Sequence, residues 1–159
     1  MAGWGFPHAD EGGGAWLGME AVRLTLQSID GRIPTTPLLT GILHHFSADV
    51  PRFVTWVNQA GPAGFGEIAP LIVQYAEQGD QHALALLKAA AQEIDKVANA
   101  LVAKQQQGVP LPCVLLGGVS KFVKPYLSTA LQDRLMERAA GPTEGALLML
   151  KAQLQQART

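Results

Sequence analysis

The sequence predicts an α/β domain that is predominantly helical, and three observations lead to this prediction. Residues 80–107 carry apolar side chains at the 3.6-residue spacing of a helix. Residues 111–116 form a short apolar run between turn-forming residues, which is typical of a buried strand. Glycine and proline divide most of the remaining chain into segments of helical length. With 159 residues, the chain is long enough for one domain with a single core.

Three helices are predicted in the first part of the chain. The first spans about 15–29, where apolar residues recur at helical spacing until an Asp-Gly pair ends it. The second begins after Thr36, an N-cap followed by proline at the first helical position, and runs to Phe46. The third begins near Asp49 and ends at a Gly-Pro pair.

The later part of the chain adds helices on both sides of the predicted strand. A helix is expected over 64–79, where Pro70 is tolerated as a kink or near a helix start. The long helix then begins with Asp80 as its N-cap. After the strand, helices are expected over 123–136 and 142–156. One strand among so many helices is unusual for an α/β domain.

The composition excludes several classes of function. The formal net charge is −1 and the 12 basic residues are scattered, which argues against nucleic acid and against an anionic membrane surface as partners. No apolar run approaches the roughly 18 residues that span a membrane. No basic and apolar leader marks a signal peptide, so a cytoplasmic location is expected. Cys113 is the only cysteine, which excludes an intramolecular disulfide.

The most distinctive segment lies at 3–18, where six glycines accompany two tryptophans and a pair of acids. Glycine loses more conformational freedom on folding than other residues, so this concentration indicates close approach of the backbone to a ligand. The carboxylates of Asp10 and Glu11 would repel phosphate but can accept hydrogen bonds from hydroxyl groups, which favours a sugar. On composition alone, a capping or turn role for Asp10 is supported equally well.

A second glycine-rich turn, Gly117-Gly118, follows the predicted strand and precedes a helix. Because no side chains project there, a planar base or a ribose can lie against the backbone. A plain strand-to-helix turn is the alternative interpretation of the same residues.

Three segments, taken together, resemble one protein family. Gly-Trp-Gly at 3–5, followed by Asp-Glu-Gly at 10–12, is similar to the sugar-site segment of N-acetylglucosamine and glucosamine kinases. These kinases belong to the BadF/BadG/BcrA/BcrD group of actin-like ATPases. Residues 114–119 resemble the adenosine-site strand and turn of that superfamily, and residues 142–148 resemble its closing helix. The resemblance implies that residues 1–159 are the C-terminal lobe of an actin-like (ribonuclease H-like) ATPase, predominantly helical, without the N-terminal lobe.

The resemblance also implies which residues form the site. Residues 1–14 would be the sugar-site loop, and residues 111–121 the adenosine-site strand and turn. The substrate-binding residues would be Gly3, Trp4 and Asp10. The residues that bind the cofactor would be Gly66, Gly117 and Gly118. The implied cofactors are ATP and Mg²⁺, and no residue of this chain is assigned as catalytic or as a metal ligand.

The function implied by the resemblance is ATP-dependent phosphorylation of glucosamine or N-acetylglucosamine at the 6-hydroxyl, by a longer hexosamine kinase with this amino sugar as its small-molecule partner. The phosphate loop and the catalytic base are expected in the absent lobe, so the isolated chain is expected to be inactive. Helix faces without a sheet to cover make a homodimer an expectation. Two alternatives stay open: an ATPase activator of a radical dehydratase, which a single cysteine fits poorly, and a non-catalytic helical interaction module from a truncated lobe.

Overall fold

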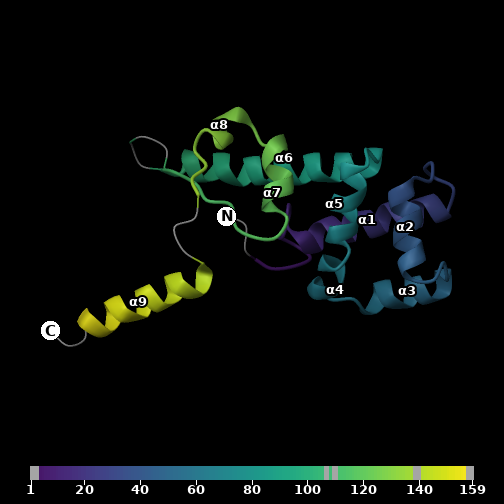
Figure 1. Ribbon diagram of the computed structural model, residues 1–159, viewed down its shortest axis with the longest axis horizontal. Coiled ribbons are helices and arrows are strands. Elements are labelled where there is room, and N and C mark those ends of the chain that lie inside the picture. The colour runs from purple at the N-terminus through teal and green to yellow at the C-terminus, as the bar shows by residue number, and fades with distance from the viewer. Residues whose placement is uncertain (1–3, 106–107, 109–110, 138–140, 157–159) are drawn as a thin grey trace.

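The computed structural model describes residues 4–105, 108, 111–137 and 141–156, and the elements among them are helices joined by turns and extended segments (Figure 1). The helices are α1 (Gly14–Ile29), α2 (Pro37–His45), α3 (Val50–Gln59), α4 (Pro62–Gly66), α5 (Ala69–Glu77), α6 (Gln81–Ala103), α7 (Ser120–Val123), η1 (Lys124–Tyr126), α8 (Thr129–Gln132) and α9 (Pro142–Gln156).

The predicted helices before residue 80 are confirmed, with one difference. Asp49 caps α3 by accepting a hydrogen bond from the N–H of Arg52 at 3.0 Å, and Thr36 precedes α2 as its N-cap residue. The region predicted as a single helix over 64–79 forms α4 and α5 instead. Pro70 lies in the first turn of α5, where its missing N–H breaks no helical bond, so the chain starts a new helix there.

The strand predicted at 111–116 is wrong, and among the described residues the structure has no strand. The segment is extended, but only Cys113 pairs, in an isolated parallel bridge with Leu135. The N–H of Cys113 donates to the carbonyl of Arg134 at 2.8 Å, and the N–H of Met136 donates to the carbonyl of Cys113 at 2.8 Å. A strand needs backbone partners along its length, and among the described residues this segment makes only these two backbone hydrogen bonds with a neighbouring segment. The described part of the chain is thus mostly helical, as predicted, but it lacks the single strand that was expected.

The helix predicted over 123–136 is also wrong, because short elements take its place. Helix α7 ends at Val123, and η1 contains Pro125, which cannot donate a helical hydrogen bond. Ser128 then caps α8 by accepting a bond from the N–H of Leu131 at 3.4 Å. Helix α6 ends at Ala103, earlier than the predicted 107, and α9 has its predicted bounds.

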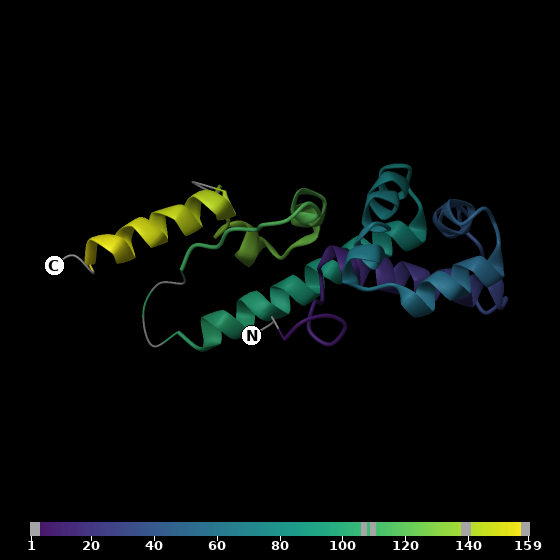
Figure 2. The ribbon, with the colours of Figure 1, turned by 90° about the horizontal axis from the view of Figure 1, so that it is seen from below.

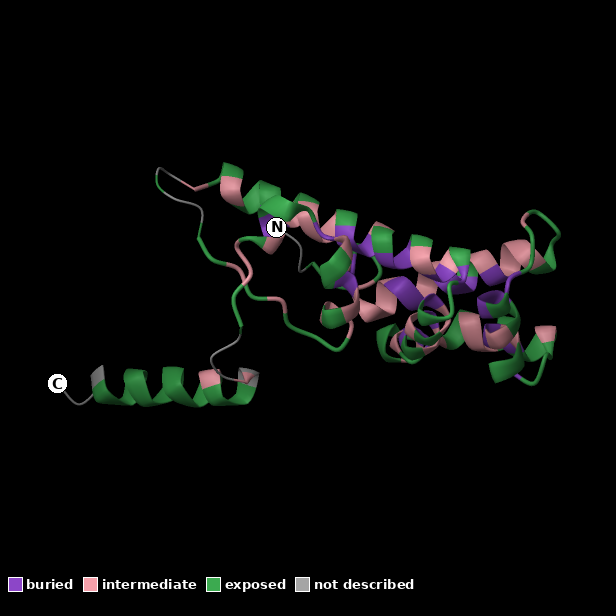
Figure 3. Cartoon of the chain, turned by 45° about the horizontal axis from the view of Figure 1, so that its top comes forward, coloured by how far each residue is buried: buried purple, intermediate pink, exposed green. Residues whose placement is uncertain are grey.

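The core forms where α1 packs against α2, α4, α5 and α6 (Figures 1 and 2). Leu17 and Ala21 of α1 are completely buried there, and Figure 3 shows the buried residues concentrated along α1 and α6. Gly18 makes the closest approach of the core, because a Cβ atom on it would lie 2.7 Å from the carbonyl carbon of Phe65 in α4 and closer still to the carbonyl oxygen. The backbones of α1 and α4 touch only because residue 18 has no side chain.

One carboxylate joins the starts of two helices. The side chain of Asp80 accepts bonds from the N–H groups of His82 at 2.9 Å and Ala83 at 3.1 Å, in the first turn of α6. Its other oxygen accepts a bond from the N–H of Leu38, in the first turn of α2, at 2.9 Å. Asp80 is 6% exposed. Burial opposes its ionisation, but these backbone donors outweigh that effect and hold the pKa of Asp80 below its ordinary value.

Helix α9 stands apart from the helices that form the core (Figures 1 and 2), and nearly all of its described residues are exposed (Figure 3). Its exposed large apolar side chains are Leu147, Leu148, Met149, Leu150 and Leu154. Apolar helix faces without a cover are what the sequence predicts, while the homodimer inferred from them stays a prediction. None of the helices in the described part of the chain is long and apolar enough to cross a membrane.

Candidate functional site

The glycine-rich loop before α1 rests directly on α6. Gly12 is buried, with a φ of +83° that favours glycine, and a Cβ atom on it would lie 3.0 Å from the carbonyl oxygen of Ala90 and 3.0 Å from the side chain of Ile94. A larger residue would therefore meet both an unfavourable backbone conformation and the surface of α6. This contact fixes the position of the loop relative to the body of the molecule.

The side chain of Asp10 folds over the start of α1. A Cβ atom on Gly13 would lie 2.9 Å from both carboxylate oxygens of Asp10, so the carboxylate occupies the space that a side chain at residue 13 would need. The N–H of Gly13 donates to the backbone carbonyl of Asp10 at 3.0 Å, and no side-chain hydrogen bond caps α1. The carboxylate therefore stands near the positive end of the helix dipole without acting as its N-cap.

The turn at Gly117 and Gly118 presents open backbone. Gly117 has a φ of +110°, and its carbonyl accepts a bond from the hydroxyl of Ser120 at 2.7 Å. No heavy atom lies within 4 Å of the position where a Cβ atom would stand on either glycine. Packing within the described part of the chain therefore does not require glycine at these two positions. Because neither residue has a side chain, the surface is open there.

The loop and the turn face each other across a hollow of about 140 Å³. A Cβ atom on Gly14 would lie 3.6 Å from the side chain of Val119, so the two segments approach each other closely at that point. The residues that line this hollow, called the loop hollow below, are Gly12, Gly13, Gly14, Ile94, Leu115, Leu116, Gly117, Gly118, Val119, Ser120 and Val123.

A larger hollow of about 460 Å³ opens on the other side of this contact, between α5 and α7. The residues that line it, called the apolar hollow below, are Gly14, Gly66, Ala69, Pro70, Val73, Gly118, Val119 and Phe122. A Cβ atom on Gly66 would meet no heavy atom within 4 Å, so this wall too is open backbone. The volume falls within the range of about 300–1,000 Å³ that is usual for small-molecule sites.

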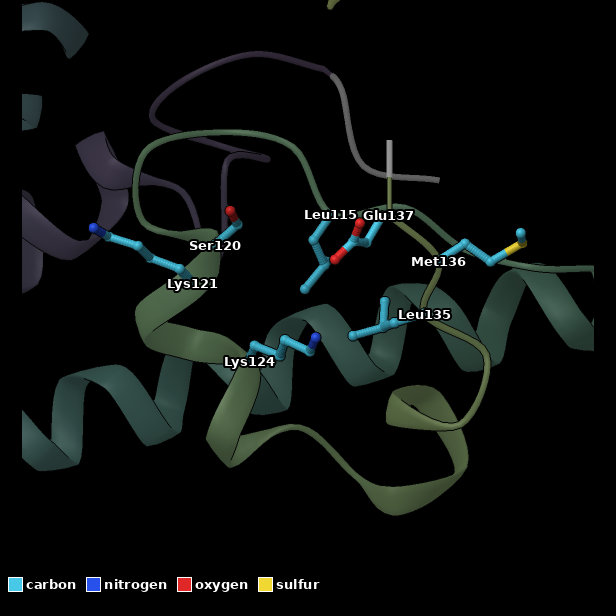
Figure 4. A pocket seen from close by; sticks show the side chains of 7 residues that line it. All are labelled: Leu115, Ser120, Lys121, Lys124, Leu135, Met136 and Glu137. Carbon is cyan, nitrogen blue, oxygen red and sulfur yellow. The ribbon is translucent and has the colours of Figure 1, made fainter. Parts of the chain in front are cut away.

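A third hollow, of about 450 Å³, lies beside the same turn and carries charge (Figure 4). In Figure 4 the side chains of Lys124 and Glu137 point into it from opposite sides, whereas Lys121 extends away from it. The ammonium group of Lys121 lies 4.6 Å from the ring centre of Phe122, as a cation–π contact. The other residues that line this hollow are Leu115, Ser120, Leu135 and Met136.

The structure brings some of the predicted site residues together and not others. Gly117 and Gly118 line the loop hollow, and Gly118 shares the apolar hollow with Gly66. Asp10 lines neither hollow, although its carboxylate contacts Gly13, which lines the first. Trp4 is 87% exposed and lines none of the three hollows. Gly3 lies outside the described residues.

Sequence reasoning missed the apolar wall residues outside the predicted adenosine-site segment at 111–121, chiefly Phe122 and Val73. Apolar side chains carry no chemical signature, and only the helical spacing of Phe122, four residues after Gly118, could have pointed to a shared face. Among the described residues, no group of three or more His, Cys, Asp or Glu side chains is placed to hold a metal ion.

Comparisons with known proteins match nearly the whole chain. Residues 1–147 match the family model of the BadF/BadG/BcrA/BcrD ATPase family. The chain is 32% identical over 143 residues to the glucosamine kinase GspK of Vibrio cholerae, covering 90% of this chain and 47% of that protein. It also superposes on a crystal structure from Chromobacterium violaceum, described as that of an N-acetylglucosamine kinase, with a TM-score of 0.83, 35% identity and coverage of 93% of this chain and 50% of the other. The chain thus spans about half the length of these relatives.

Proposed function

Because the chain belongs to the BadF/BadG/BcrA/BcrD ATPase family, we propose that it is the half of an ATP-dependent amino-sugar kinase that holds the nucleoside and part of the sugar. The substrate is glucosamine or N-acetylglucosamine, and the reaction transfers phosphate to its 6-hydroxyl. The observation that carries this proposal is that residues 12–14 of the glycine-rich loop face Gly117 and Gly118, with the apolar hollow opening beside them. The relatives named above are kinases of these two sugars, which supports the choice of substrate.

The apolar hollow fits the nucleoside part of ATP. Gly66 and Gly118 stand on two of its walls, and at both positions a Cβ atom would project into open space rather than into protein. Backbone of this kind lets a flat ring approach closely. ATP supplies the phosphoryl group, and Mg²⁺ neutralises charge on its phosphates. Mg²⁺ in kinases is bound through the substrate phosphates and one or two carboxylates, so we propose that it enters this site with the nucleotide.

The sugar is proposed to lie beside the glycine-rich loop, within reach of Asp10. A carboxylate accepts hydrogen bonds from sugar hydroxyls more strongly than a neutral group does. The half-buried carboxylate of Asp10 is held against Gly13 and does not cap α1, so its oxygens are available to a ligand. The role proposed for Gly3 and Trp4, backbone and ring contacts with the sugar, rests on the family resemblance alone.

The proposal limits what this chain does by itself. Since it spans about half the length of its relatives, we expect it to bind nucleotide and sugar without transferring phosphate between them. Sugar-dependent release of ADP by the 159-residue chain would contradict this expectation. The cytoplasmic location stays a prediction.

Substitution Gly66→Ala is expected to weaken ATP binding by about tenfold without lowering stability. The new methyl group would stand in the apolar hollow, where it meets no protein atom within 4 Å, and alanine is favoured over glycine within a helix such as α4. The loss of affinity corresponds to about 1.4 kcal/mol. Isothermal titration with ATP, with thermal unfolding alongside, measures both effects.

The control for Gly66→Ala is Gly145→Ala. Gly145 is also a helical glycine with no heavy atom within 4 Å of its Cβ position, but it belongs to α9 and lines none of the three hollows. It should leave ATP binding unchanged. If both variants bind ATP as the unmodified chain does, the apolar hollow is not the nucleoside site.

Substitution Asp10→Asn is expected to weaken glucosamine binding by about two- to thirtyfold and to leave ATP binding unchanged. Hydrogen bonds to a charged acceptor contribute about 1.5–3 kcal/mol, against about 1 for a neutral pair. The matched control is Glu11→Gln, because Glu11 is the adjacent acid and is exposed. Ligand-observed NMR with glucosamine measures the affinities of both variants. Equal sugar affinities for the two variants and the unmodified chain would remove Asp10 from the sugar site.

A further inference from the structure

The side chains around the apolar hollow have no means of telling one purine from another. We infer that this hollow binds purine nucleotides with little selection of the base, so that guanine and hypoxanthine nucleotides bind about as well as adenine nucleotides. This inference rests on the proposed function and specifies the class of nucleotide that the same site accepts. It concerns the base alone and does not depend on the identity of the sugar.

The walls of the apolar hollow consist of glycine and apolar residues. Its described lining residues comprise three glycines together with Ala69, Pro70, Val73, Val119 and Phe122, and none of these has a side-chain hydrogen-bond donor or acceptor. The two lysines nearest to Phe122 in the chain, Lys121 and Lys124, are not among the residues that line the apolar hollow. The ammonium group of Lys121 is directed at the ring of Phe122, 4.6 Å from its centre.

Some backbone groups near the hollow are also unavailable to a base. Pro70 has no N–H to offer. The carbonyl of Gly117 already accepts bonds from the N–H and the hydroxyl of Ser120, and the carbonyl of Val119 accepts bonds from the N–H groups of Phe122 and Val123. These two carbonyls are therefore already hydrogen-bonded within the chain, which reduces the number of backbone acceptors free to read the edge of a base.

Adenine, hypoxanthine and guanine differ only in the donors and acceptors on their edges, and their flat faces are alike. A site that hydrogen-bonds such groups can reject the wrong ligand by about 10⁴-fold or more, whereas an apolar pocket discriminates by about a hundredfold at most. Contact between a base and an aromatic ring tolerates any base, because every base has a flat π face. Phe122 supplies such a ring at this site.

The test is competition among ADP, GDP and IDP for the 159-residue chain, with a fluorescent ADP analogue as the displaced probe and Mg²⁺ present. The three dissociation constants are expected to agree within about tenfold. If ADP binds a hundredfold or more tightly than both GDP and IDP, the inference is wrong while the proposed kinase function stands. If none of the three displaces the probe and the probe itself does not bind, the proposed nucleoside site and this inference fail together.

A pair of variants tests the aromatic wall. Phe122→Leu keeps an apolar side chain but removes the ring. It should weaken the binding of ADP, GDP and IDP by the same factor, about five- to a hundredfold. The matched control is Tyr126→Leu, because Tyr126 is also half-buried and also has a lysine ammonium near its ring, Lys88 at 6.0 Å, yet lines none of the three hollows. This control should bind all three as the unmodified chain does. A loss confined to ADP in Phe122→Leu would overturn the inference.

Discussion

Substitution Gly18→Ala is expected to destabilise the chain by more than about 3 kcal/mol, beyond the usual cost of overpacking a core. The added methyl group would collide with the backbone of Phe65, whose carbonyl carbon lies 2.7 Å from the Cβ position. A flexible side chain could move aside, but a backbone carbonyl inside α4 cannot, so α1 and α4 must separate. Thermal unfolding should show a fall in Tm of roughly 10 °C or more for a domain of this size.

Gly14→Ala is the control for this prediction. It makes the same substitution in the same helix, but its Cβ atom would lie 3.6 Å from Val119 and 3.7 Å from Ala69, which is ordinary contact. Its Tm should stay within a few degrees of that of the unmodified chain. Equal Tm values for the two variants would show that α1 and α4 do not rely on the close approach at Gly18.

Substitution Asp80→Ala is expected to cost about 3–5 kcal/mol of stability. Loss of one N-cap costs about 0.5–2 kcal/mol, and each buried donor left unpaired adds a penalty of about 1–3 kcal/mol. Asp80 accepts from the N–H groups of Leu38, His82 and Ala83, so its removal leaves the starts of both α2 and α6 without a partner. Urea unfolding measures the change, and Asp49→Ala, which removes an exposed cap of α3 alone, should cost only about 1 kcal/mol.

The same carboxylate makes stability depend on acidity. The pKa of Asp80 is lowered in the folded chain from its ordinary value of 3.8, so the folded state favours the ionised form. Its contribution to the free energy of unfolding is fully present well above pH 3.8 and is lost as the pH falls through the lower pKa of the folded state. Asp80→Asn should flatten this part of the curve. An unchanged acid dependence in Asp80→Asn would assign the effect to other groups.

Local features of the fold could be predicted from the sequence because their causes lie within a few residues. Asp80 was identified as an N-cap and Asp49 as the start of a helix, and each side chain accepts a bond from an N–H group three residues further on. The bond from Leu38 to Asp80 spans 42 residues, and no local pattern indicates it. The apolar run at 111–116 was predicted as a strand, and this prediction failed for a non-local reason. An extended apolar segment becomes a strand only if partners are present along its length.

The residues of the candidate site can likewise be separated into those that the sequence indicated and those that it did not. The glycines at 12–14 and 117–118 drew attention because glycine is costly without a reason, and the structure places them at one hollow. Gly66 was implied only by the family resemblance, and it lies on the hollow that Gly118 also lines. Phe122 and Val73 were missed, because an apolar residue in a wall looks like any residue of a core until the fold exposes it.

The loop hollow and the apolar hollow share three lining residues, Gly14, Gly118 and Val119. If each hollow holds a molecule, both molecules contact these shared residues, and we expect occupancy of one hollow to change the free energy of filling the other. Thermodynamic linkage makes this effect reciprocal. The factor by which the first molecule changes the affinity for the second equals the factor by which the second changes the affinity for the first. A dissociation constant measured for one of them is therefore defined only at a stated concentration of its neighbour.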